Sequence, residues 1–98
     1  NLDEMKKTVD NNGVIIARCF QDVEHYVLIT KIDENFAYIF DPYYLEEDYY
    51  YDDEDVAIVL HETFTHNRIV KIDRLLSGEN RDFSLLEESK REVILIGR

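Results

Sequence analysis

Residues 25–42, HYVLITKIDENFAYIFDP, decide how we expect this chain to fold. Two runs rich in β-branched and aromatic residues flank Asp33-Glu34-Asn35, a turn-forming triplet whose last residue tolerates the left-handed backbone of three-residue hairpin loops. The pattern predicts an antiparallel hairpin with strands at 25–32 and 36–41. Pro42 ends the second strand because it has no N–H to donate to the ladder.

The loop length fixes which residues face each other. With three loop residues, facing positions add up to 68, as 32 and 36 do, so that His25 faces Tyr43 and Val27 faces Asp41. His25 and Asp41 become diagonal neighbours at the open end of the hairpin, about 7–8 Å apart at Cβ or somewhat closer, within reach of an imidazole–carboxylate hydrogen bond. A two-residue loop would put these two side chains on opposite faces.

The same register predicts which side chains share a face. One face carries the odd-numbered residues His25, Val27, Ile29, Ala37, Ile39 and Asp41. The other carries the even-numbered residues Tyr26, Leu28, Ile32, Phe36, Tyr38 and Phe40.

A histidine beside an aspartate has a recognised chemical use. The carboxylate fixes the tautomer of the ring and stabilises the imidazolium, while the other ring nitrogen can deprotonate a nucleophile. The alternative interpretation is a surface histidine beside an aspartate that merely ends a strand.

The rest of the chain predicts short elements around this hairpin. Leu2, Met5 and Val9 form a stripe that indicates a helix over 1–12. Further strands are expected at 14–20, 56–60, 68–72 and 92–97, a helical turn at 72–76, and a short helix opening at the capping box 84–87. We therefore expect residues 1–98 to form one α+β unit, a mostly antiparallel sheet with short flanking helices.

Charge and cysteine content exclude several classes of function. The chain has 22 acidic residues against 11 Lys and Arg, a formal net charge of −11, so nucleic acid is not an expected partner. No apolar run approaches the roughly 20 residues that span a bilayer, so membrane insertion is not expected. The single cysteine, Cys19, excludes an internal disulfide and multi-cysteine zinc sites. We expect no metal or other cofactor, and a reducing, cytoplasmic location.

Residues 2–42 resemble the C-terminal half of the double-glycine (bacteriocin-processing) cysteine peptidase-like family, of the papain-like superfamily. The resemblance is carried by a short helix, the apolar strand at 13–17, the strand opening with His25-Tyr26-Val27, and the strand ending in Asp41-Pro42. It implies the β half of a papain-like domain, with His25 as catalytic base and Asp41 as its orienting acid. It also implies a peptide or peptidyl substrate, cleaved or transferred by Cys-His-Asp chemistry.

The chain departs from this family in two ways. The family's nucleophilic cysteine and oxyanion-hole glutamine lie far upstream, in a half that these residues do not contain, and Glu24 stands where the family often has glycine. Since the sequence opens on Asn1 rather than methionine, we expect a longer parent protein. We expect the chain alone to be inactive, the missing half lying elsewhere, or the domain to be a non-catalytic peptide-binding or regulatory module. A strand edge left open would allow homo-oligomers.

Three other groups of residues were weighed as sites. Cys19 precedes His25 on the neighbouring strand, but strand thiols are more often buried hydrophobes than nucleophiles. His61 and His66 are five positions apart and miss the spacing of a zincin helix.

The third group is the segment 43–55, which holds five tyrosines and seven acidic residues and predicts a long exposed excursion. Its acids lack the spacing of a calcium-binding loop. The alternatives to a solvated loop are a calcium site or an acidic rim that attracts a basic peptide.

Overall fold

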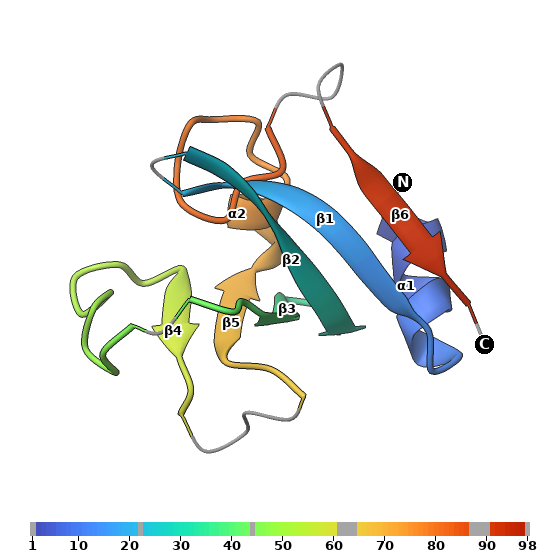
Figure 1. The fold of residues 1–98 in the computed structure, drawn as a ribbon, viewed down its shortest axis with the longest axis horizontal. Helices are drawn as coiled ribbons and strands as arrows, with labels where there is room; N and C mark the ends of the chain where they lie inside the picture. The colour runs from blue at the N-terminus through green and yellow to red at the C-terminus, as the bar shows by residue number, and fades with distance from the viewer. Residues whose placement is uncertain (1, 22, 44, 61–64, 87–90, 98) are drawn as a thin grey trace.

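The computed structural model describes residues 2–21, 23–43, 45–60, 65–86 and 91–97. Over these residues the chain is α+β, as predicted, with a six-stranded antiparallel sheet in the order β4-β5-β3-β2-β1-β6 (Figure 1). The elements are α1 (Leu2–Asp10), β1 (Val14–Gln21), β2 (Val23–Ile32), β3 (Phe36–Phe40), β4 (Val56–Ile58), β5 (Arg68–Lys71), α2 (Ile72–Leu75) and β6 (Val93–Ile96). Neither helix is long and apolar enough to cross a membrane.

The β2–β3 hairpin changes register at Thr30. Next to the turn Ile32 pairs with Ala37, one position away from the predicted register, whereas beyond Thr30 the pairs are Ile29 with Ile39 and Leu28 with Phe40, as predicted. Thr30 is therefore the extra residue of a β-bulge. Its hydroxyl lies 2.8 Å from the carbonyl oxygen of Thr65 and 3.3 Å from that of Tyr38.

The predicted three-residue loop is wrong because Asp33 organises a tighter closure of the turn. Its carboxylate accepts the backbone N–H groups of Asn35 at 2.9 Å and Phe36 at 2.8 Å, and its own N–H donates to the Phe36 carbonyl at 2.9 Å. Ile32 consequently points to the face opposite the predicted one and is buried in the core. The bulge then restores the predicted face for the rest of the strand.

One face of the sheet carries the core. Ile15, Ile29 and Ile39 lie side by side across β1, β2 and β3 and are fully buried. They are covered by Met5 and Val9 of α1, Leu75 of α2, and Phe83 and Leu85 of the following loop. The other face carries an apolar row across four strands, formed by Ile94, Ile16, Leu28 and Phe40.

The helix predicted to open at 84–87 is not present in residues 84–86, and 87–90 lie outside the described residues. Phe83 and Leu86 have φ angles of 68° and 67°, in the left-handed region that a right-handed helix cannot use. The backbone here bonds to the end of β1 instead. Phe83 donates its N–H to the Phe20 carbonyl at 2.7 Å, and Phe20 donates to the Ser84 carbonyl at 2.9 Å.

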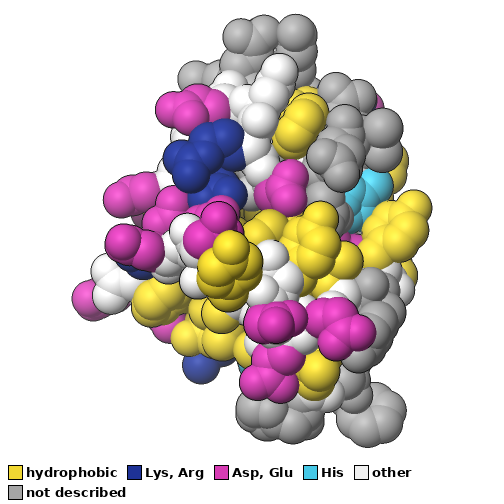
Figure 2. Space-filling model, turned by 90° about the vertical axis from the view of Figure 1, so that its left-hand side faces the viewer, with side chains coloured by type: hydrophobic (Ala, Val, Ile, Leu, Met, Phe, Trp, Pro, Cys, Tyr) yellow, Lys and Arg dark blue, Asp and Glu magenta, His cyan; other side chains and the backbone are white. Residues whose placement is uncertain are grey.

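The segment 43–55 is less free than the sequence predicted. Its described acidic side chains gather with aromatic ones on the face shown in Figure 2, and Tyr51 is 85% exposed. Tyr50, however, packs its ring against Phe83 and donates its hydroxyl to Asp82 at 2.7 Å. Arg74 of α2 forms ion pairs with Asp53 and Asp55 from below the segment.

Replacing Arg74 should detach this segment. Its side chain is nearly buried, so we expect Arg74→Ala to lower the free energy of unfolding by about 1–3 kcal/mol, less than for a fully buried pair because Asp53 and Asp55 are partly exposed. Its hydrogen bond is the main cause of the lowered pKa of Asp53. A lowered pKa stabilises the fold above about pH 4, and that contribution is lost as the pH falls further.

Urea unfolding at neutral pH and near pH 3 measures both effects. Arg74→Ala should lose less stability on acidification than the wild type does. Arg81→Ala, at a half-exposed position that also pairs with Asp55, is the matched control and should change stability by no more than about 0.5 kcal/mol. Equal losses in the two variants would contradict the anchoring role of Arg74.

Candidate functional site

His25 and Asp41 meet at the open end of the hairpin. His25 lies on β2, Asp41 follows β3 directly, and the distance from His25 Nε2 to Asp41 Oδ2 is 3.0 Å. The Asp41 side chain is 0% exposed and the His25 side chain is 13% exposed. The structure thus brings the two predicted residues into contact, while their catalytic role stays a prediction.

The contact with Asp41 defines the tautomer of His25. Because a carboxylate accepts hydrogen bonds, Nε2 carries the proton, and Nδ1 of the neutral ring keeps its lone pair. No described residue hydrogen-bonds to Nδ1. The ring of Tyr43, which is 61% exposed, meets the imidazole edge to face at 5.5 Å between centroids. His25 is therefore held on one nitrogen and able to accept a proton on the other.

Asp41 is fixed by main-chain and side-chain bonds. Its Oδ1 accepts the N–H of Tyr43 at 3.0 Å. Its main-chain N–H donates to Asn67 Oδ1 at 2.8 Å, and its carbonyl accepts Asn67 Nδ2 at 2.6 Å. Next to Asn67, the buried Arg68 donates to the Tyr43 carbonyl at 2.7 Å.

Sequence reasoning missed Asn67 and Arg68. Both belong to the site only because β5 pairs with β3, which brings Arg68 opposite Ile39. No short motif marks that pairing. A polar residue beside an arginine at the start of a predicted strand is a signal too common to single out.

Cys19 shares the buried face with this pair. It lies on β1 directly opposite His25 and is 0% exposed. Burial, with a smaller contribution from the negative charge of Asp41, raises the pKa of the thiol to about 12. A thiol is nucleophilic as its thiolate, so Cys19 is a protonated core residue near neutral pH.

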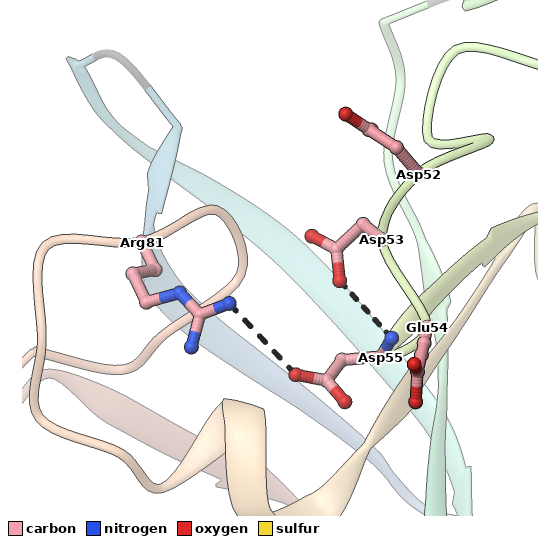
Figure 3. A pocket seen from close by; sticks show the side chains of 5 residues that line it. All are labelled: Asp52, Asp53, Glu54, Asp55 and Arg81. Atoms are coloured by element: carbon pink, nitrogen blue, oxygen red, sulfur yellow. Dashed lines mark hydrogen bonds and ion pairs between the residues drawn. The ribbon is translucent and has the colours of Figure 1, made fainter.

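The other predicted groups do not join this site. The ring of His66 packs against Tyr38, and His61 lies outside the described residues. Figure 3 shows Asp52, Asp53, Glu54 and Asp55 lining a shallow pocket with Arg81, whose guanidinium points toward Asp55. Over the described ranges, no group of three or more histidine, cysteine or acidic side chains is arranged to hold a metal ion.

Comparison of the chain with protein-family models, curated proteins and solved structures found no match. The resemblance to the double-glycine peptidases therefore depends on the motif order and on the geometry around His25.

The state of Cys19 can be tested directly with a thiol reagent. We expect the native chain at pH 8 to resist modification by iodoacetamide, because the thiol is both buried and protonated. The urea-unfolded chain should be modified at the rate of a free cysteine and serves as the control. Rapid modification of the native chain near neutral pH would show an ionised, accessible thiol and contradict this assignment.

Proposed function

We propose that this chain is the His- and Asp-bearing half of a papain-like cysteine peptidase-like domain of the double-glycine type. The observation that supports this proposal is the 3.0 Å contact between His25 Nε2 and the fully buried Asp41 carboxylate, with Nδ1 unoccupied by any described residue. A ring held in this way suits a general base, because its orientation and tautomer are set before a substrate arrives.

In this proposal each residue has one role. His25 Nδ1 takes the proton of a cysteine thiol, and the resulting thiolate attacks the carbonyl carbon of a peptide bond. The imidazolium then returns the proton to the leaving amine. Asp41 holds the ring and stabilises its positive charge throughout.

The nucleophile comes from a chain segment other than these residues. Cys19 is the only cysteine here, and its thiol is buried and protonated. We therefore propose that residues 1–98 alone do not cleave peptides, and that a cysteine-bearing half completes the site beside Tyr43, where the His25 ring reaches the surface.

The second candidate is a non-catalytic peptide-binding or regulatory module on the same scaffold. It is favoured by the sealed state of Cys19, because a scaffold that has lost its nucleophile keeps only its binding surface. Exposed Tyr43 and the acidic segment after it would then contact a peptide, and basic peptides would be attracted most strongly.

Activity of the natural polypeptide that contains this chain separates the two candidates. We expect it to hydrolyse peptides, and we expect His25→Ala to lower kcat/KM roughly 100-fold or more, the usual contribution of a general base. Asp41→Asn should also lower kcat/KM, since it removes the charge that stabilises the imidazolium. His66→Ala replaces a histidine outside the site and should leave the rate within about twofold.

A peptide-based electrophile that labels active-site thiolates provides an independent readout. The wild type should be labelled, and His25→Ala should be labelled more slowly. Peptide binding without cleavage or labelling would contradict the peptidase and support the binding module. Full activity of His25→Ala would contradict the assigned base.

A further inference from the structure

We infer that Asn67, supported by Arg68, is a positioning residue that holds Asp41 in contact with His25. Its meaning for catalysis rests on the proposed function, but the contact itself does not. The inference uses the described ends of β3 and β5 and the turn of residues 41–43.

The amide of Asn67 replaces a strand that has ended. The β3–β5 ladder stops at the pair of Ile39 and Arg68, so Asp41 lies beyond the last main-chain pair. The Asn67 side chain both accepts from the Asp41 N–H at 2.8 Å and donates to the Asp41 carbonyl at 2.6 Å. Only an amide side chain offers an acceptor and a donor spaced to match a peptide unit. These two bonds fix the main chain from which the carboxylate projects.

Arg68 fixes the other end of the same turn. Its guanidinium donates to the Tyr43 carbonyl at 2.7 Å, and the Tyr43 N–H donates to Asp41 Oδ1 at 3.0 Å. This chain of contacts leaves Oδ2 directed at His25. Asn67 and Arg68 therefore hold both sides of the residue that orients the imidazole.

Arg68 also places a positive charge near the buried carboxylate. Burial lowers the pKa of Arg68, and the negative charge of Asp41 opposes that shift, so the two groups interact inside the fold. A buried carboxylate is unstable without a countercharge, and the neutral imidazole provides none. The guanidinium thus lets Asp41 stay at His25 whether or not the ring is protonated.

The ring N–H proton of His25 reports this positioning by NMR. We expect the wild-type chain to show a slowly exchanging Nε2–H resonance, which His25→Gln removes and so assigns. In Asn67→Ala the proton should exchange with water roughly tenfold faster, the change that corresponds to losing about one hydrogen bond of typical net strength. Asn80→Ala, at an exposed position, is the matched control and should exchange as the wild type does.

Exchange distinguishes positioning from simple support of the fold. If Asn67 only stabilises the structure, Asn67→Ala will lower the Tm but leave exchange unchanged well below the unfolding transition, and the inference fails. If Asn67→Ala does not fold, Arg68→Lys decides, because lysine keeps the charge but loses the fixed fork of donors. It should speed exchange severalfold, whereas Arg91→Lys, which alters an arginine bonded to the Leu76 and Leu86 carbonyls, should not.

These measurements need no enzymatic activity. A protein that shows the predicted exchange but never cleaves peptides would refute the proposed peptidase and keep the positioning role. Activity with unchanged exchange in both variants would refute the positioning role alone.

Discussion

A carboxylate buried at the end of β3 constrains much of this structure. The Asp41 side chain is fully enclosed, and an ionised carboxylate without partners in that position costs several kcal/mol. Its partners come from three places: His25 on β2, the Tyr43 N–H in the following turn, and the charge of Arg68 on β5. The strands must all be in place before the carboxylate is satisfied, so the site and this part of the fold form together.

The bulge at Thr30 makes that arrangement geometrically available. The turn closed by Asp33 sets a pairing that, continued unchanged, would put His25 and Asp41 on opposite faces of the hairpin. One extra residue in β2 reverses the alternation, and the Thr30 hydroxyl is within hydrogen-bond distance of the Thr65 carbonyl, close to the start of β5. Bulges often redirect a side chain next to a functional site, and this one redirects His25.

The sequence predicted the elements better than their details. Apolar alternation located the β2–β3 hairpin, β1 and β6, because a half-buried strand leaves a period of two in the sequence. The face of Ile32 was predicted wrongly, since Asp33 bonds two N–H groups in the turn and no pattern announces a bulge. The helix expected at residues 84–87 failed at 84–86, where tertiary bonds to Phe20 outweigh a capping motif.

The candidate site was predictable only in part. The closeness of His25 and Asp41 followed from one hairpin, a local feature. Asn67 and Arg68 reach them through the non-local pairing of β3 with β5, and the burial of Cys19 depends on what covers the sheet. Such long-range contacts are set by packing of the whole chain and leave no local signature.

A double-mutant cycle on His25 and Asp41 tests the central contact most directly. Urea unfolding at pH 7 would be measured for His25→Gln, Asp41→Asn and the double variant, with Asp3→Asn in α1 as an exposed control paired with His25→Gln. The contact predicts that the His25 and Asp41 changes are non-additive by about 1–2 kcal/mol, while those at His25 and Asp3 add within about 0.5 kcal/mol. Additive changes at His25 and Asp41 would mean that the two side chains do not interact, and would contradict the account.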